Sequence, residues 1–468
     1  MASARPSRVR AAPARYDEEQ AAAYELAQLA WQERNPAAVE EVEEESSSDS
    51  EVEEGPAEDE ERKESDRHPP AFPWSAEHTP VQPHAFAPPR ARSAPPHAAD
   101  TPLDFFRLFM PRSYVQSMAE MTNAFAEAEH PVPRGRAAAA AAAAAAGEEW
   151  TEATAEEIDA LLGCLIYMGI VRLNATHDYW ADQTRQAFVA DCFPRNRFLA
   201  LLRRLRVSEG VVGEDERLEK LQQLIDLLEG RLRRYFYPGR FICVDEAMVG
   251  FQGRSVMVQF IAKKSSPTGF KVWMLVDCAT NYVVAFDVFT GRKGRAKESR
   301  ASAAVVMKLI ERLEVGAHHV VSMDGYFSSV QLAEDLLAKG FYTIGTTRHN
   351  RRHFPKELLA EVEEKERGEW VWRQKKDSPL VVTSWRDKKP VNFLSTCADP
   401  TKSSTVTRWV DGAEQEFDCP EVVPLYTKYM RGVDVFAQRQ SYNKIGRRSR
   451  KWFFSLVWFL VDVAIHNA

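Results

Sequence analysis

The sequence predicts an α/β protein in which a mixed sheet is flanked by a mostly α-helical domain. Three observations predict this class. Residues 101–240 carry apolar side chains at helical spacing, four short apolar runs with turn-forming connections follow residue 240, and alternating helical and strand patterns continue to residue 346. The 468 residues suffice for two or three domains with a sizeable core, so a small disulfide-stabilised scaffold is excluded.

The amino-terminal region differs in composition from the rest of the chain. Residues 1–67 hold 20 acidic and 8 basic residues, a net charge of −12, whereas the remainder carries 53 basic and 48 acidic residues, a net charge of +5. Ten prolines then lie between Pro69 and Pro102. Such segments bury too little apolar surface to offset the entropy of ordering the chain. We therefore expect residues 1–100 to form a disordered acidic tail followed by a Pro-rich, extended linker.

Residues 101–240 are expected to form the first part of the helical domain. A capping-box pattern from Thr154 to Glu157 precedes an apolar stripe, which is typical of a helix with one buried face. The ten alanines at 137–146 offer helix propensity but no specific packing, so we expect a loop insertion there. Further helical patterns occupy residues 103–109, 198–205 and 218–232.

The pattern changes to strands at Phe241. Four strands are predicted at residues 241–245, 255–262, 270–277 and 282–289, and their short connections require antiparallel pairing. Helix, strand, helix and strand follow at residues 305–313, 319–324, 332–337 and 341–346. This is the order of a mixed sheet of the ribonuclease H type, so we expect residues 241–349 to form the first part of such a domain.

Charged, Trp-bearing residues 350–425 interrupt this pattern and are expected to form an insertion domain. They include a predicted hairpin of residues 379–386 and 390–395. We expect residues 426–443 to return to the sheet domain and residues 444–468 to form the second part of the helical domain.

Two aspartates are predicted to meet at one edge of the sheet. Asp245 closes the first strand and Asp324 closes the strand after the helix, and in a mixed sheet these strands can lie side by side. Paired carboxylates repel unless a cation lies between them, and hard divalent cations such as Mg²⁺ prefer oxygen ligands. Two such ions about 4 Å apart can hold the attacking and the leaving oxygen of an in-line phosphoryl displacement. Asp434 would add a third ligand if its segment returns as a helix to the same edge.

These residue types leave alternatives open. An aspartate at a strand end is most often a turn residue or a helix cap. Other acidic residues compete on equal terms, namely Glu246, Asp277 and Asp287. Spacing alone therefore does not identify the ligands.

Longer motifs surround these aspartates. VDEAMVGFQGR at 244–254, MDGYFSS at 323–329 and RGVD at 431–434, followed by SYNKIGRRSRKWFFSLVWFLVDVAIHNA at 441–468, resemble the aspartate motifs and closing helix of piggyBac-type transposases and their domesticated relatives. The resemblance extends from about Pro102 to Ala468. It implies that Asp245, Asp324 and Asp434 are catalytic and bind two Mg²⁺ ions, with Mn²⁺ as a substitute, in a ribonuclease H-like domain.

The resemblance also implies a reaction and its partners. Such a protein is expected in the nucleus, where, as a homodimer, it would cleave double-stranded DNA at transposon ends, form a hairpin and join the end to a TTAA target. The helical parts would serve dimerisation and DNA binding. The alternative is a domesticated descendant that binds DNA or chromatin without transposition activity.

Two departures from the family pattern bear on these alternatives. The family usually carries another aspartate three residues after the position of Asp434, where this chain has Ala437. The chain also stops at Ala468, before the cysteine-rich, zinc-binding segment that family members commonly carry, so we expect weak recognition of specific DNA ends.

Basic residues gather close to Asp434 in the sequence. Such clusters neutralise DNA phosphates but read bases poorly, although a solvated loop is the alternative. The predicted DNA-binding residues are Arg439, Lys444, Arg447, Arg448, Arg450 and Lys451, with Arg348, Arg351 and Arg352 as a second, weaker group. Three lysines would either border the same DNA-binding cleft or act only as solubilising residues, namely Lys263, Lys264 and Lys271.

Cysteine spacing and hydropathy exclude other classes of protein. No two of the six cysteines form a CxxC pair, which indicates a reducing compartment and no structural zinc site. No charged-then-apolar leader opens the chain, and the longest apolar run, from Trp452 to Ile465, is interrupted by Ser455 and Asp462, so we expect neither a signal peptide nor a membrane span.

Overall fold

The computed structural model describes residues 72–80, 82–88, 99–128, 150–210, 213, 215–262, 264, 266–291, 298–313, 317–410, 412–446 and 449–468. The disorder predicted for residues 1–71 and the loop insertion predicted at 137–146 fall outside these ranges.

The helical domain begins as its sequence predicts. Thr101 and Thr154 each accept a hydrogen bond from the backbone N–H three residues on, and the acidic residues there, Asp104 and Glu157, complete two capping boxes. The helices are α4 (Pro102–Phe109), α5 (Arg112–Ala128), α7 (Ala155–Ile170), α8 (Ala187–Ala190), α9 (Arg195–Arg204) and α10 (Gln222–Tyr235), with 3₁₀ turns η2 (Thr176–Trp180) and η3 (Glu216–Leu218).

The central strands confirm the predicted order. β2 (Phe241–Gly250), β3 (Val258–Phe260), β4 (Thr268–Asp277) and β5 (Val283–Val288) pair antiparallel, with β4 as the partner of the other three. Then come α11 (Glu298–Ile310), β6 (Val320–Met323), α12 (Val330–Ala338) and β7 (Tyr342–Thr346), and β6 pairs parallel with both β2 and β7. One prediction was wrong in detail. Asp245 does not close its strand, because pairing with β4 continues β2 as far as Gly250.

Residues 350–425 extend the same sheet. After α13 (Glu357–Glu363), β8 (Trp370–Lys375), β9 (Val381–Arg386) and β10 (Pro390–Ser395) form antiparallel neighbours, which confirms the predicted hairpin. β10 also pairs with β7, so within the described part of the chain one sheet of ten strands runs from the inserted residues into the central strands. β11 (Ser403–Val410) and β12 (Ala413–Pro420) form a separate two-stranded ribbon.

Part of the Pro-rich segment packs against this sheet, whereas the sequence predicted an extended linker. β1 (Trp74–Ser75) pairs antiparallel with β8, and the Trp74 indole N–H donates to the carbonyl oxygen of His353 at 3.0 Å. Phe72 and Trp74 pack against a small hydrophobic core that includes Leu358 of α13. The composition of the segment as a whole predicts no core, but these two aromatic side chains supply enough apolar area for it to pack against the sheet.

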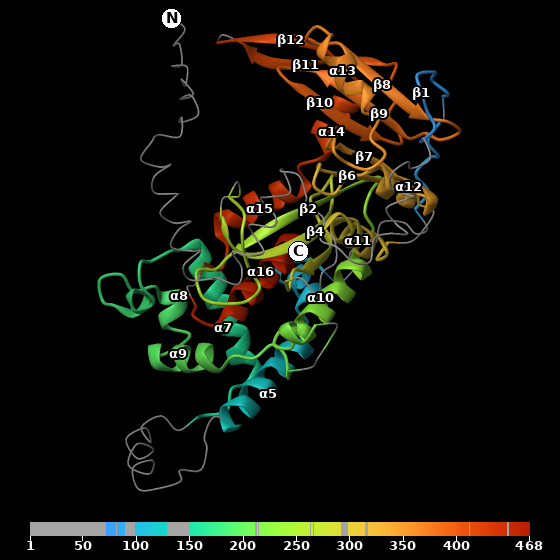
Figure 1. The fold of residues 1–468 in the computed structure, drawn as a ribbon. Coiled ribbons are helices and arrows are strands. Elements are labelled where there is room, and N and C mark those ends of the chain that lie inside the picture. The colour runs from blue at the N-terminus through green and yellow to red at the C-terminus, as the bar shows by residue number, and fades with distance from the viewer. Residues whose placement is uncertain are drawn as a thin grey trace, which may run out of the picture.

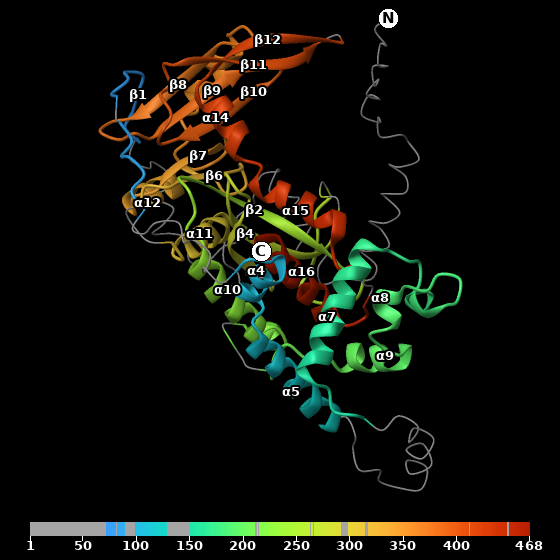
Figure 2. The ribbon, with the colours of Figure 1, turned by 180° about the vertical axis from the view of Figure 1, so that it is seen from behind.

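The carboxyl-terminal helices return to the central strands. α14 (Val422–Tyr429) is followed by α15 (Gly432–Asn443), which packs on β2 and β4, and by α16 (Trp452–Asn467), which is largely buried and contacts α10, α4 and β2. Figures 1 and 2 show the result: a β-rich end with β8 to β12, a helical end with α5, α7 and α9, and β2 with α15 and α16 between them. Among the described residues, none of the helices combines the length and the apolarity that crossing a membrane requires.

Candidate functional site

Asp245 and Asp324 occupy corresponding positions on neighbouring strands. The last parallel pair between β2 and β6 is Val244 with Met323, so the two aspartates are the next residue on each chain segment. Beyond this pair β6 ends, whereas β2 continues alongside β4. The turn after β6 is held in part by the Asp324 side chain, because the amide of Tyr326 donates to Asp324 Oδ1 at 3.0 Å. The prediction that these two strands lie side by side is confirmed.

The segment before α15 is attached to the same face of the sheet. Alternate residues of a strand point to the same side, so Asp245 shares a face with Cys243. The Cys243 thiol donates to the Met430 carbonyl oxygen at 3.1 Å, and the Cys278 thiol donates to the Tyr429 carbonyl oxygen at 3.2 Å. A Cβ on Gly432 would lie 3.2 Å from the Cβ of Cys243, so only glycine allows this approach without a shift.

This close packing brings the first turn of α15 over β2. Asp434 lies in that first turn and is exposed. Burial, and then the charge of Asp245, raise the pKa of the Cys243 thiol, and the Asp434 charge acts in the same direction on this thiol and on the Lys264 ammonium. Asp434 therefore lies on the side of the sheet that carries Asp245, and its role as a third ligand stays a prediction.

Lys264 lies among these acidic residues, in the connection between β3 and β4. Its ammonium group donates to the Glu246 carbonyl oxygen at 3.0 Å and pairs with Glu246 Oε1 at 3.0 Å and with Asp245 Oδ1 at 3.9 Å. Burial acts to lower the pKa of Lys264, but the charges of Asp245, Glu246 and Asp434 outweigh burial and raise it. We call Asp245, Glu246, Asp324 and Asp434 the acidic cluster.

The electrostatics at this site disfavour ionisation of Asp245 and Asp324. Burial, and then the neighbouring charge of Glu246, raise the pKa of Asp245 to about 8, against the opposing effect of Lys264. Burial and the Glu246 charge also raise the pKa of Asp324, although hydrogen bonds from the amides of Tyr326 and Phe327 act in the opposite direction. Carboxylates of this kind gain most from a cation placed between them.

The fold is similar to that of a solved transposase. The cryo-EM structure of the piggyBac transposase synaptic complex with hairpin DNA matches with a TM-score of 0.67 at 23% sequence identity, over 81% of this chain and 76% of that chain. A family model described as Transposase IS4 matches residues 101–468, which is most of the chain. The chain belongs to the piggyBac-type transposase family. The resemblance inferred from the motifs is thereby confirmed.

Human members of the piggyBac-type family are similar over much of this chain. PiggyBac transposable element-derived protein 3 is 25% identical over 326 residues, covering 67% of this chain and 54% of the human protein. PiggyBac transposable element-derived protein 2 is 24% identical over 330 residues, covering 67% of this chain and 55% of the human protein. PiggyBac transposable element-derived protein 5 is 20% identical over 395 residues, covering 81% and 71%. The chain spans about half the length of the first two.

Transposases of this type generally use divalent metal ions. Among the residues described in this piggyBac-type chain, no three His, Cys, Asp or Glu side chains form a metal-binding group. The donor chemistry nevertheless fits a hard cation, because Asp245 and Asp324 present carboxylate oxygens from adjacent strand positions and their burial penalises ionisation without a counter-charge. Ala437 lies one turn after Asp434 on α15, so the position where the family usually has a further aspartate adds no charge.

The predicted DNA-binding residues fall into three groups. Arg439 is exposed within α15, and Lys444 and Arg450 are exposed after its end. Lys451 is partly buried, and its ammonium donates to the Arg203 carbonyl oxygen at 2.7 Å, which joins this segment to α9. Arg447 and Arg448, like Lys263, lie outside the described residues.

The second basic group divides between two roles. Arg348 is exposed, and its Cγ lies 3.7 Å from the position of a Cβ on Gly325, next to Asp324. Arg351 instead turns inward, because its guanidinium donates to the carbonyl oxygens of Gly325 and Tyr326 at 3.1 and 2.5 Å. It stabilises the turn after Asp324, a role that the sequence analysis did not predict. Arg352 is exposed.

Sequence reasoning also missed the separate roles of the lysines beside β4. Lys264 was grouped with Lys271 as a residue bordering the cleft, but Lys271 is buried, with its ammonium 5.4 Å from the Trp273 ring centre and 5.7 Å from that of Tyr326. Lys264 thus contacts carboxylates of the acidic cluster, whereas Lys271 lies among aromatic rings. Both lie within one short stretch of sequence, and no local pattern separates them.

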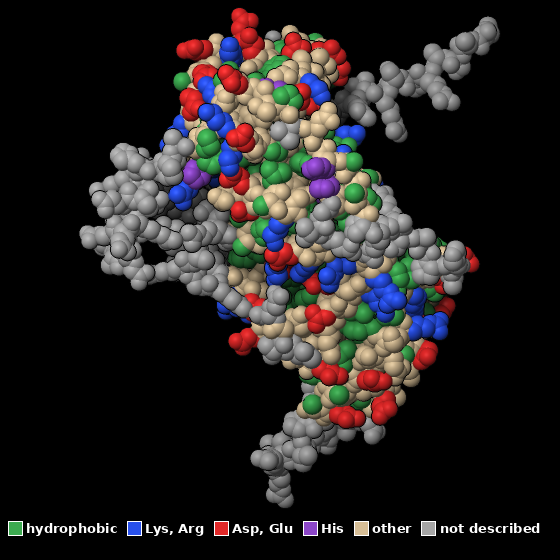
Figure 3. Space-filling view, turned by 90° about the vertical axis from the view of Figure 1, so that its right-hand side faces the viewer, with side chains coloured by type: hydrophobic (Ala, Val, Ile, Leu, Met, Phe, Trp, Pro, Cys, Tyr) green, Lys and Arg blue, Asp and Glu red, His purple; other side chains and the backbone are tan. Residues whose placement is uncertain are grey.

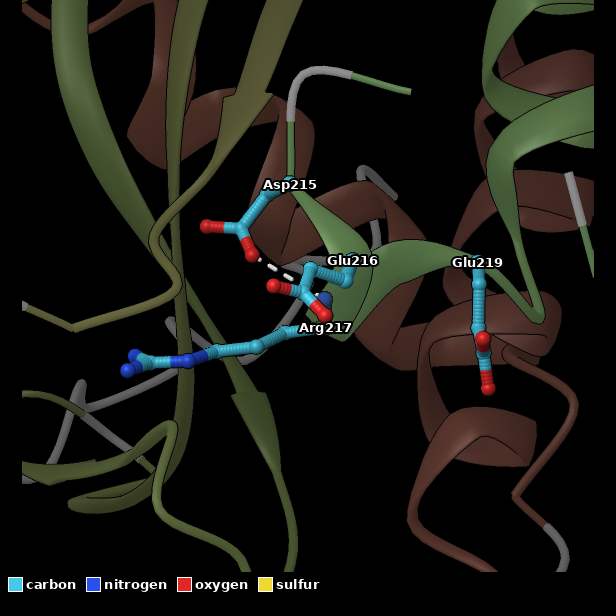
Figure 4. A pocket seen from close by; sticks show the side chains of 4 residues that line it. All are labelled: Asp215, Glu216, Arg217 and Glu219. Atoms are coloured by element: carbon cyan, nitrogen blue, oxygen red, sulfur yellow. Dashed lines mark hydrogen bonds between the residues drawn. The ribbon is translucent and has the colours of Figure 1, made fainter. Parts of the chain in front are cut away.

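Two other surface features give less support for a binding site. A pocket of about 490 Å³ is lined by Asp215, Glu216, Arg217 and Glu219 (Figure 4). Asp215 there accepts from the Arg217 amide at 3.0 Å and caps η3, and no lining residue belongs to the acidic cluster. On the face in Figure 3, acidic and basic side chains are interspersed over the upper part, so that area presents no single sign of charge to a polyanion.

Proposed function

We propose that this chain acts on double-stranded DNA as a metal-dependent transposase-type nuclease through Asp245, Asp324 and Asp434. The observation that carries the proposal is the placement of Asp245 and Asp324 directly after the last parallel pair of β2 and β6, with α15 packed on the same face. The strand order β5-β4-β2-β6-β7, antiparallel and then parallel, supports a ribonuclease H-like catalytic domain.

The residues of this chain have separable tasks in the proposed reaction. Asp245 and Asp324 would hold Mg²⁺, or Mn²⁺ in its place, and Asp434 would approach from α15. The bound ions would polarise the phosphodiester and activate the attacking oxygen. Arg351 and the amides after β6 hold Asp324 in position, and the thiols of Cys243 and Cys278 hold the segment that leads to Asp434. Exposed basic side chains would neutralise the DNA backbone.

The proposal extends to the assembly and its location. We infer a homodimer that works in the nucleus on transposon ends and TTAA targets, with residues 101–240 and 444–468 serving dimerisation and DNA binding and residues 350–425 forming an insertion domain. Family membership of residues 101–468 supports this assignment.

A second function is favoured by two specific observations. Ala437 removes a carboxylate that the family usually has, and Lys264 places a positive charge beside Asp245 and Glu246. Both fit a domesticated protein that binds DNA or chromatin without strand transfer.

Nicking of supercoiled plasmid separates the two functions. With the full chain and either Mg²⁺ or Mn²⁺, the enzymatic proposal predicts conversion of supercoiled to open-circular DNA that stops in EDTA. A parallel gel-retardation measurement reports binding. DNA retardation without any metal-dependent nicking would leave only the binding function.

The exposed basic residues give a second prediction. Replacing Arg439, Lys444 and Arg450 together with alanine is expected to weaken DNA binding and to reduce the salt dependence of log K by about two to three units, because each phosphate contact contributes about 0.9. Fluorescence anisotropy across a salt series measures this slope. The matched control replaces three exposed lysines of the inserted region, Lys365, Lys376 and Lys388. Equal slopes for the two triple variants would remove the first three residues from the interface.

A further inference from the structure

Lys264 forms contacts that differ from those of an ordinary surface lysine. Its side chain is 25% exposed, and its ammonium lies 3.0 Å from a carboxylate oxygen of Glu246, 3.0 Å from the Glu246 carbonyl oxygen and 3.9 Å from a carboxylate oxygen of Asp245. The carboxylates it meets are themselves largely buried, with side-chain exposures of 16% for Glu246 and 17% for Asp245. A partly buried ammonium with these partners is a counter-ion.

The position of Lys264 conflicts with occupancy of the same cluster by divalent cations. An ammonium carries a single charge, which neutralises only one of the four carboxylates. A divalent cation bound to Asp245 would repel an ammonium that lies within 4 Å of the same side chain. The lysine side chain has a flexible four-carbon stem, so its charged end can leave while its backbone stays in place.

We propose that Lys264 is an internal counter-ion that holds Asp245 and Glu246 in position before a metal ion binds, and that its ammonium moves to a DNA phosphate when the metal enters. Lys264 is then a positioning residue, because it acts through Asp245. This inference rests on the proposed function, since it concerns the same cluster. It couples metal binding to DNA binding: the cation that enters the cluster releases a basic group for the substrate.

The first test measures metal binding without catalysis. The free-ion electron paramagnetic resonance signal of Mn²⁺ is titrated with the full-length protein in the absence of DNA. Lys264→Met keeps the length of the stem and removes the charge, so we expect it to bind Mn²⁺ about tenfold more tightly than the parent. Lys264→Arg should bind as the parent does. Lys339→Met, which removes a lysine paired with Glu311, is the charge-matched control and should have no effect.

The second test measures the transfer to DNA. With Mn²⁺ present, Lys264→Met is expected to lower the salt slope of DNA binding by about one unit, because one phosphate contact is lost. Without a divalent ion the slopes of parent and variant should agree. Lys264→Gln repeats both tests if the methionine variant fails to fold by circular dichroism.

The outcomes distinguish this inference from the proposed function. If Lys264→Met and Lys264→Gln bind Mn²⁺ no more tightly than the parent, while Asp245→Asn binds it more weakly, the metal site stands and the counter-ion role is refuted. A salt slope that does not respond to the metal refutes the transfer to DNA. If the parent and Asp245→Asn bind Mn²⁺ equally, metal binding at Asp245 is refuted, and the proposed nuclease function is refuted as well.

Discussion

Asp324→Asn is expected to reduce metal-dependent nicking by about 10³-fold or more while DNA retardation stays unchanged. The substitution keeps the size of the side chain and an oxygen that can accept the Tyr326 amide, but it removes a negative charge that a divalent ion requires. Loss of one charge-stabilising group in a preorganised site has effects of about this size. The measurement is the single-turnover rate of plasmid nicking in Mg²⁺ and in Mn²⁺.

A matched control separates this effect from a general loss of charge. Asp335→Asn makes the same change at an exposed position of α12, where the side chain accepts from Gln331, and should nick as the parent does. Thermal unfolding should show that the Asp324 variant is folded. If it is folded and nicks at the parent rate, Asp324 has no part in the chemistry and the proposed site is incorrect.

Asp462→Asn is expected to stabilise the protein at neutral and alkaline pH. Asp462 lies on α16 with 7% exposure and accepts from the Gln440 side chain at 3.1 Å and from the Ile445 amide at 3.3 Å. It thereby attaches the end of α15 and the segment that carries Lys444 to the buried last helix. Burial raises the pKa of Asp462 to about 7, although these two hydrogen bonds and the Lys444 charge act to lower it.

The sign of the pH dependence follows from this raised pKa. Below about pH 4 the carboxyl group is protonated in both the folded and the unfolded chain, so its ionisation does not change the free energy of unfolding. Between about pH 4 and 7 the folded chain holds the proton that the unfolded chain has lost, so the free energy of unfolding falls as the pH rises. A shift of about three pKa units corresponds to a loss of roughly 4 kcal/mol above pH 7, as an order of magnitude.

Urea unfolding of the parent and of Asp462→Asn from pH 4 to pH 8 measures this difference. The two curves should converge near pH 4 and separate progressively, with the variant more stable at pH 8 by about 2 to 4 kcal/mol. Asp335→Asn serves again as the exposed control and should follow the parent. Parallel curves for parent and Asp462→Asn would show that the buried carboxyl group does not titrate in this range.

Local signals predicted a large part of the fold. The capping box at Thr154, the hairpin of β9 and β10, and the antiparallel group of β2 to β5 all depend on residues within about 35 positions of one another. The neighbouring positions of Asp245 and Asp324 were also predicted, because chain order limits which strands of a mixed sheet can be adjacent. Interactions between segments far apart in sequence were predicted poorly. The packing of Trp74 on β8 is one example, and the inward turn of Arg351 is another.

Sequence alone determined which side chains are available here: three aspartates within family motifs, a run of basic residues after Asp434, and an alanine at position 437. Tertiary structure decided which of them meet. Lys264 and Lys271 are seven residues apart, yet one contacts carboxylates and the other lies against aromatic rings. Cys243 and Cys278 became the supports of a segment about 150 to 190 residues further along. The reason is physical: composition and spacing specify charge and local geometry, whereas the neighbour of a buried group depends on how distant segments pack.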